Sequence, residues 1–333
     1  MKKSVTYLIS GILLTTFVFG IIACRNEENP VVYQKGIFPD SLVSLTGLNS
    51  DFDDYNISLY TLNNYLPLIF SSNRASNGEQ FDLVQGVLVY TFDQTTGDFQ
   101  LQSEISDNQF FNELTSMLTT SGNDFGPYRL YSSLDGFEYT IASSVNDDGN
   151  LDFHYVRNLP YFGAAAPAIT GPFPAIKVNS IADDAYICFD TNQDSAYFCS
   201  DADGDFDIYL LKRDASENMD SWLNSDYETP VRAETFNSPG NDKCPYLYRK
   251  ILVFTSDRPG GLGGYDLYYS IFSGGRWSSP VNFGPRINSS SNEYRPVLGG
   301  DEQFSNQFMI FSSDRPGGKG GFDLYFTGIK LAG

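Results

Sequence analysis

The stretch that decides the fold is residues 307–325, Q-F-M-I-F-S-S-D-R-P-G-G-K-G-G-F-D-L-Y. An aromatic and aliphatic run leads into a polar corner, a glycine-rich reversal and a second aromatic run. This pattern is typical of two antiparallel strands joined by a wide turn. Residues 252–268, L-V-F-T-S-D-R-P-G-G-L-G-G-Y-D-L-Y, follow the same plan, so the chain contains a repeat.

Degraded copies of this motif occur upstream, at 68–83, 141–155 and 197–209. The aligned serines are Ser72, Ser144, Ser200, Ser256 and Ser313, which gives steps of 72, 56, 56 and 57 residues. A second motif, an Asn-Ser-acid loop, precedes each copy at 49–54, 121–124, 179–184, 237–242 and 288–293. Because the two motifs keep step, we count five units.

Repeats of this length, built from short strands, indicate the blades of a β-propeller. We therefore predict an all-β, five-bladed propeller over residues 31–333, with a six-bladed ring as the alternative. The fifth unit ends without a fourth strand, whereas residues 31–39, V-V-Y-Q-K-G-I-F-P, form a strand without a unit. We expect 31–38 to pair with 322–329, which would close the ring and remove an exposed sheet edge.

Insertions lengthen three units. Apolar residues at helical spacing predict a short helix over 107–118, with Asp107 as its cap, and residues 215–224 predict another. Residues 159–174 are rich in Pro and Gly, and we expect no regular structure there.

The net charge of the 333-residue chain is −20, and loss of a leader that carries Lys2 and Lys3 but no acid takes it to −22. Nucleic acid is excluded as a partner, because binding it requires a basic face. A cation, a basic protein or an uncharged glycan fits this charge better.

The N-terminus has the pattern of a secretory leader. Lys2 and Lys3 precede an apolar run that ends in Ile21-Ile22-Ala23-Cys24. This ending resembles a bacterial lipobox, which implies a signal peptide at 1–23, lipidation of Cys24 and membrane anchoring through that lipid. Residues 24–30 would be a tether, and its acidic residues resemble the surface-export signals of Bacteroidetes-type lipoproteins.

The repeated strings F-S-S-D-R-P-G-G-x-G-G-[FY]-D-L-Y and P-V-N-F-G-P-R-I-N-S-S-S-N-E-Y-R-P resemble the WD-type, TolB-like β-propeller repeat of bacterial envelope proteins. This resemblance covers 236–329 best and implies an outer-membrane lipoprotein. Members often carry a peptidoglycan-binding domain of the OmpA type, which this sequence lacks. The resemblance implies no reaction, because propellers include both enzymes and binding scaffolds.

The Asn-Ser-acid loops would place a ring of carboxylates at the mouth of the central channel, where they could bind a cation or a basic ligand. These candidates are Asp54, Asp124, Asp184, Asp242 and Glu293. A feature that recurs in every blade is better explained by turn structure, since carboxylates accept backbone N–H bonds there.

Metal and nucleophile chemistry have few candidates. Asp201, Asp203 and Asp205 alternate in one short loop, so calcium there is the alternative to a chain without a cofactor. Export to an oxidising compartment makes a disulfide between Cys188 and Cys199 an option. His154 is the only histidine, which excludes the usual zinc sites and leaves a serine triad one possible base.

Residues that break the repeat are the better pointers to function, because exposed aromatic side chains can stack on sugars or anchor a protein partner. The candidates are Tyr161, Phe162, Phe173 and Trp222. From the sequence we expect a non-catalytic, lipid-anchored binding or assembly module of the outer membrane or cell surface, with an envelope protein or glycan as its partner. The alternative is a carbohydrate-binding protein or a glycoside hydrolase of the five-bladed propeller type.

Overall fold

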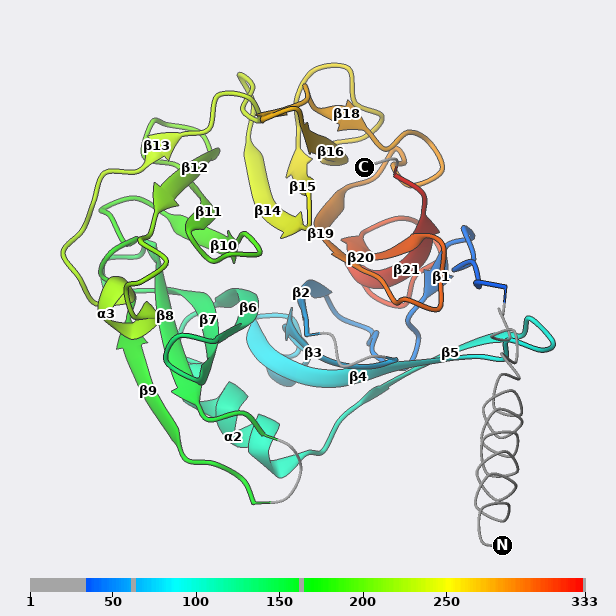
Figure 1. Ribbon diagram of the computed structural model, residues 1–333, viewed down its shortest axis with the longest axis horizontal. Coiled ribbons are helices and arrows are strands. Elements are labelled where there is room, and N and C mark those ends of the chain that lie inside the picture. Colours follow the sequence, from blue (N-terminus) through cyan, green and yellow to red (C-terminus); the bar gives the residue numbers. More distant parts are fainter. Residues whose placement is uncertain (1–33, 61–63, 162–164, 332–333) are drawn as a thin grey trace, which may run out of the picture. The chain divides into compact units, whose positions relative to one another are not determined.

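The computed structural model describes residues 34–60, 64–161 and 165–331. The predicted leader and tether, at 1–23 and 24–30, lie outside these residues. The unit Lys35–Gly333 consists of five antiparallel sheets arranged around a ring, as Figure 1 shows. The predicted five-bladed, all-β propeller is therefore confirmed.

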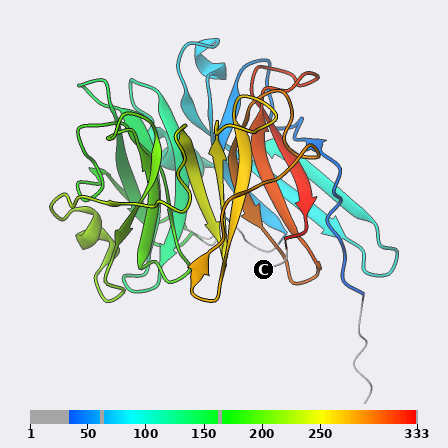
Figure 2. The same ribbon diagram turned by 90° about the horizontal axis from the view of Figure 1, so that it is seen from above.

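Each blade runs outward from an innermost strand, and its strands connect two opposite loop faces (Figure 2). Blade 1 contains β2 (Asp54–Leu59), β3 (Tyr65–Ser72), β4 (Asp82–Phe92) and β5 (Phe99–Ile105). Blade 2 contains β6 (Asp124–Ser132), β7 (Phe137–Val145), β8 (Leu151–Asn158) and β9 (Ile169–Pro174). Blade 3 contains β10 (Asp184–Phe189), β11 (Ser195–Ser200), β12 (Asp207–Lys212) and β13 (Val231–Arg232).

Blades 4 and 5 follow the same plan. Blade 4 contains β14 (Asp242–Tyr248), β15 (Ile251–Ser256) and β16 (Asp266–Ser273), and β16 also pairs with β17 (Arg276–Trp277) and β18 (Val281–Asn282). Blade 5 contains β19 (Glu293–Gly299), β20 (Gln307–Ser313), β21 (Asp323–Ile329) and, as its outermost strand, β1 (Val43–Ser44).

Neighbouring blades are joined through the two repeated motifs. Between blades 4 and 5, the Glu293 N–H donates to the carbonyl of Tyr265 at 2.7 Å, and the Tyr265 N–H donates to Asn292 Oδ1 at 3.0 Å. A Cβ on Gly263 would overlap the backbone carbonyl of Ser291 in the next blade. Glycine is therefore needed at this position of the loop, because the backbone of the adjacent blade's loop packs directly against it.

The ring closes with the same contacts. The Asp54 N–H donates to the carbonyl of Phe322 at 2.8 Å, and the Phe322 N–H donates to Asp53 Oδ1 at 2.8 Å. Blade 5 therefore meets blade 1 as blade 4 meets blade 5.

The strand that closes the ring is not the predicted one but lies later in the sequence. Val43 and Ser44, in β1, pair with Phe326 and Tyr325 of β21, whereas 31–33 lie outside the described residues. The described part of 31–38 contacts the approach to β20 instead, where the Phe38 N–H donates to Asn306 Oδ1 at 2.8 Å. The reason is packing, because the buried ring of Phe38 stacks on Phe304 at 3.7 Å.

The insertions differ from their predictions in detail. The first predicted helix forms as α2 (Gln109–Leu118), but its cap is Asn108, whose side chain accepts the Phe111 N–H, and not Asp107. The second forms as the shorter α3 (Met219–Leu223). The expectation of no regular structure at 159–174 is wrong for β9, because an outermost strand pairs on one side only and tolerates prolines.

Over the part of the chain that the structure describes, no helix has the length and apolar character needed to cross a membrane.

Candidate functional site

The ring of predicted acids does not face an open channel. All five carboxylates are buried, each with an exposed fraction of 0–1%. They belong to Asp54, Asp124, Asp184, Asp242 and Glu293. In blades 1, 4 and 5 each acid is paired with the arginine of the repeated Ser-x-Arg corner. The pairs are Asp54 with Arg74, Asp242 with Arg258 at 2.5 Å, and Glu293 with Arg315 at 2.9 Å.

The paired acids also hold the turn that precedes their strand. Asp242 Oδ2 accepts the backbone N–H of Ser238 at 2.6 Å and its hydroxyl at 2.8 Å. Such contacts stabilise a tight turn. In these three blades the repeated acids therefore serve the fold, and they are not free to bind a ligand.

Side chains fill the centre of the ring. The innermost strands each carry a bulge with a left-handed residue, such as Tyr186 in β10 and Arg295 in β19. Both are buried, and the guanidinium of Arg295 lies 5.4 Å from the ring of Tyr186. Tyr55 stacks on Phe322 at 5.5 Å. Burial raises the pKa of the hydroxyls of Tyr55 and Tyr186 well above 10, so both stay neutral.

Among the described aromatic candidates, Tyr161 lines a cavity, whereas Phe173 and Trp222 do not line it. Trp222 is 1% exposed, and its ring lies 5.8 Å from that of Phe189. The prediction that it is an exposed aromatic is therefore wrong, because α3 turns it into a core that residues of blades 2 and 3 share. Phe173 is half-buried against Tyr155. Phe162 lies outside the described residues.

The metal and disulfide options also find no support. Asp201 Oδ1 accepts the Asp183 N–H and Asp203 Oδ2 accepts the Tyr209 hydroxyl, so these carboxylates hold the loop. Within the described ranges no three His, Cys, Asp or Glu side chains lie together as metal ligands. The described cysteines are free, buried thiols, so of the two options for Cys188 and Cys199 the disulfide is not formed. Cys199 pairs across the sheet with Ala185, and a bulge separates this pair from Cys188.

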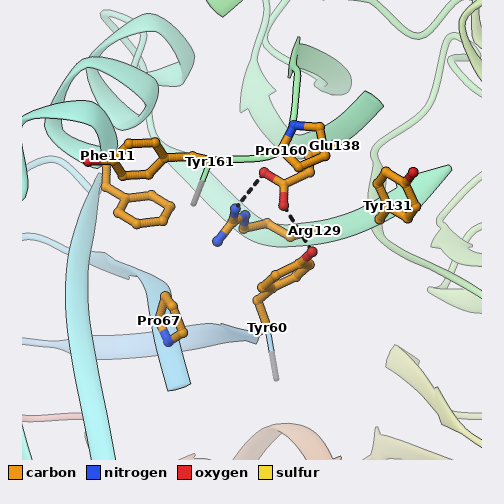
Figure 3. A pocket seen from close by; sticks show the side chains of 8 residues that line it. All are labelled: Tyr60, Pro67, Phe111, Arg129, Tyr131, Glu138, Pro160 and Tyr161. Carbon is orange, nitrogen blue, oxygen red and sulfur yellow. Dashed lines mark hydrogen bonds and ion pairs between the residues drawn. The ribbon is translucent and has the colours of Figure 1, made fainter. Parts of the chain in front are cut away.

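The cavity that contains Tyr161 lies between blades 1 and 2 and has a volume of about 330 Å³ (Figure 3). We call it the interblade pocket. Aromatic side chains and prolines form most of its wall, and one acid and one base lie within it. Its lining residues are Tyr60, Pro67, Phe111, Arg129, Tyr131, Glu138, Pro160 and Tyr161. Ligand pockets have volumes of roughly 300–1,000 Å³, mostly apolar walls and a few polar groups.

Adjacent strands of blade 2 place the two charged groups. Arg129 lies on β6 and Glu138 on β7, and Arg129 Nη2 is 3.4 Å from Glu138 Oε2. The Tyr60 hydroxyl donates to Glu138 Oε1 at 2.9 Å, and Asn158 Nδ2 donates to Oε2 at 3.0 Å. These three donors from two blades fix the carboxylate of Glu138 in one position.

Aromatic rings enclose the guanidinium of Arg129. It lies 4.5 Å from the ring centre of Tyr60 and 4.9 Å from that of Phe111, and its Nε and Nη1 are buried without a hydrogen-bond partner in the described structure. Burial lowers the pKa of Arg129, and burial together with Glu138 raises the pKa of Tyr60 to about 12. At neutral pH the Tyr60 hydroxyl therefore remains a hydrogen-bond donor.

Tyr60, Arg129 and Glu138 are not among the site residues predicted from the sequence. The available signal was a charged residue within each of two apolar strands, at Y-R-L-Y (128–131) and F-E-Y-T-I (137–141). His154, the candidate triad base, contacts the carbonyl of Leu118 through Nε2 at 2.7 Å and does not line this pocket.

No family model matches this sequence, and no curated protein matches it. The fold is similar to that of a thermostable family-43 glycoside hydrolase, with a TM-score of 0.53, 10% identity and coverage of 87% of this chain and 94% of that chain. It is also similar to an endo-arabinase from Bacteroides thetaiotaomicron, with a TM-score of 0.52, 12% identity and coverage of 90% and 99%. An α-L-arabinofuranosidase from Lactobacillus brevis aligns with a TM-score of 0.50, 11% identity and coverage of 87% and 95%.

These comparisons correct two predictions. The identification as a TolB-like repeat protein is wrong, because the similar structures are glycoside hydrolase propellers and no family model supports the repeat family. The prediction of a non-catalytic binding module, and with it of a chain that is not an enzyme, is contradicted, because the similar structures are glycoside hydrolases. At 10–12% sequence identity, the structural similarity to these proteins establishes a shared fold.

Proposed function

We propose that this protein is a glycoside hydrolase of the five-bladed propeller type, and that a sugar unit of its glycan substrate occupies the interblade pocket. The observation that carries the proposal is the buried carboxylate of Glu138, fixed by three donors within a largely aromatic cavity. The similar fold of an endo-arabinase and an α-L-arabinofuranosidase supports arabinose-containing glycans as the first substrates to test.

The aromatic walls fit the binding step. Sugar rings present apolar C–H faces, and Tyr131 and Tyr161 offer ring surfaces on which such a face can stack. Arg129 and Glu138 offer polar groups beside these walls, which suits the hydroxyl groups at a sugar's edge.

The carboxylate fits the chemical step. Glycoside hydrolysis proceeds through a transition state with positive charge on the sugar ring, which a nearby carboxylate stabilises. Glu138 is the one carboxyl group among the described residues that line the pocket. We assign it this stabilising role. A water oxygen bonds to the anomeric carbon as the bond from that carbon to the leaving oxygen breaks, and one proton of the same water passes to the leaving oxygen.

Two substitutions test the proposal with arabino-oligosaccharides and aryl α-L-arabinofuranosides as substrates. We expect the wild type to release sugar from at least one of them. Glu138→Gln should lower kcat by about 10²-fold or more, because it removes the negative charge but keeps the shape. Tyr131→Ala should raise KM with little change in kcat, because it removes a stacking surface without touching the buried ion pair.

Tyr65→Ala is the matched control, since Tyr65 is an exposed aromatic of blade 1 that does not line the pocket. Its kinetics should equal those of the wild type. Melting curves establish that each variant is folded. Absence of hydrolysis by the wild type on every substrate, or unchanged hydrolysis by folded Glu138→Gln, would reject the assignment.

We further propose that a lipid on Cys24 anchors the chain to the bacterial outer membrane, which would hold the propeller near extracellular glycans. The leader ending Ile21-Ile22-Ala23-Cys24, which resembles a lipobox, supports this membrane anchoring. Cys24→Ser should move the protein from the membrane fraction to the soluble fraction, because the acyl chains supply the membrane affinity. Equal membrane retention of this variant in fractionated cells would contradict lipid anchoring.

A further inference from the structure

Three blades contain a guanidinium-binding slot that their own arginine fills. In blade 4, Arg258 Nη2 donates to Asp242 Oδ1 at 2.5 Å and to the carbonyl of Phe236 at 2.5 Å, and its Nε donates to Ser256 Oγ at 2.9 Å. Blade 5 repeats this set around Arg315, and blade 1 repeats it around Arg74. The slot thus offers a carboxylate, a hydroxyl and a backbone carbonyl.

Blade 3 keeps the slot and lacks the arginine. Ala202 stands where the repeat has Arg258, two residues after the last serine of the second strand. The residues aligned with the three acceptors are Asp184, Ser200 and Val178, and all three line a cavity of about 190 Å³. We call this cavity the blade-3 slot.

The acceptor groups of the blade-3 slot are buried and in place, but not all of them accept a hydrogen bond. Asp184 is 1% exposed, and its Oδ2 accepts the Ser180 N–H at 2.6 Å, as Asp242 accepts the Ser238 N–H in blade 4. Ser200 is 2% exposed, and its Oγ lies beside the carboxylate of Asp184 and accepts no hydrogen bond within the described structure. A bound N–H donor would therefore find a buried acceptor that the protein leaves unused.

The charge around the blade-3 slot favours a cation. Asp203 also lines it. Arg232 is the one basic residue of the described lining, but its Nε and Nη2 donate to Asp207 at 2.5 and 2.8 Å, and its Nη1 donates to Glu234 at 2.6 Å. Two carboxylates therefore neutralise Arg232, and the carboxylate of Asp184 is left without a cationic partner.

Aromatic side chains and the kind of donor atoms select the ligand. Tyr209 and Tyr227 line the blade-3 slot, and aromatic faces attract guanidinium groups. The acceptor set is the one that binds a guanidinium in the other three blades. Blade 2 also lacks the arginine, but there Asp124 accepts hydroxyl hydrogen bonds from both Thr120, at 2.9 Å, and Ser144. The slot with an unused acceptor is therefore in blade 3.

We propose that the blade-3 slot binds a guanidinium group supplied from outside the chain, either free arginine or an arginine side chain of a partner polypeptide. Asp184 pairs with the guanidinium, and Ser200 Oγ and the Val178 carbonyl accept its remaining N–H bonds. This site is separate from the interblade pocket, so the inference does not depend on the proposed hydrolase activity.

The full-length protein can be tested by calorimetric titration at pH 7.5 with Nα-acetyl-arginine amide and with the peptide Gly-Gly-Arg-Gly-Gly. Nα-acetyl-citrulline amide, which is similar in shape but uncharged, is the control ligand. We expect saturable binding of the arginine compounds, at least tenfold tighter than of the citrulline compound. Tighter binding of the peptide assigns a partner's side chain as the natural source, whereas equal binding assigns the free compound.

Two variants of the blade-3 slot should weaken binding. Asp184→Asn should lower the affinity at least tenfold. Ala202→Arg should abolish binding and raise Tm, because it fills the slot as Arg258 does in blade 4. Asp51→Asn, at an exposed acid, should bind like the wild type. Equal affinity for the arginine and citrulline compounds, or undiminished affinity in Ala202→Arg, would overturn the proposal.

Discussion

The residue that follows the repeated serine by two positions determines whether a blade's buried acid is paired. Arg258 neutralises Asp242 in blade 4, whereas Ala202 leaves Asp184 without a cation in blade 3. Burial then raises the pKa of Asp184 to about 6, although hydrogen bonds from Ser200 and Ser180 lower it. A small sequence change thus converts a structural acid into a titratable one.

This pKa predicts a pH-dependent stability. Because the folded protein binds the Asp184 proton more tightly than the unfolded chain does, the free energy of unfolding should gain from this group as the pH falls from 7 to about 4. The gain is at most ~3 kcal/mol, since each pKa unit corresponds to about 1.4 kcal/mol. Urea unfolding at pH 7 and pH 5 should show this gain in the wild type and a smaller one in Asp184→Asn. Identical pH dependence in both proteins would contradict it.

The sequence predicted the repeated residues better than the pocket residues. The buried acids, serines and glycines recur in five copies, so alignment alone indicates a structural role. Tyr60, Arg129 and Glu138 occur once each and come from two blades, and only the packing of blade 1 against blade 2 brings them together. The spacing of residues along one chain contains no information about such a contact.

At the scale of elements, the prediction was most accurate for the second and third strands of each blade. These strands lie between neighbours within the sheet, and their apolar runs, such as β15 and β20, are buried along nearly their whole length. The outermost strands were predicted poorly because each pairs on one side only. β1 is two residues long, and β9 contains two prolines, so neither has a strong strand pattern.

The segment before β1 should contribute strongly to stability despite its lack of regular structure. Phe38 is fully buried and contacts Phe304, Tyr90 and Phe308. Phe38→Ala should therefore lower the free energy of unfolding by about 3–5 kcal/mol, through lost contacts and the cavity that remains. Ile37→Ala is the control, because Ile37 is 68% exposed and should change stability by less than about 0.5 kcal/mol. Urea denaturation measures both, and equal effects would show that the segment does not anchor the ring.

At the scale of the whole molecule, repetition and function lie in different places. The five units form a closed ring in which the last interface uses the same pair of hydrogen bonds as the interface between blades 4 and 5. The interblade pocket and the blade-3 slot both lie where the units differ. The interblade pocket is lined by residues of α2 and of the segment after β8, and the blade-3 slot contains a substituted loop residue. The candidate functional sites of this chain therefore lie where its units depart from the repeat.

We propose that the interblade pocket hydrolyses a glycan through Glu138. The release of reducing sugar from arabino-oligosaccharides by the wild type, Glu138→Gln and Asp184→Asn, measured in parallel, tests this. We predict release by the wild type, a loss of about 10²-fold or more in Glu138→Gln, and near wild-type release in Asp184→Asn, whose change lies in the other cavity. No release by the wild type, or equal release by folded Glu138→Gln, would contradict the claim.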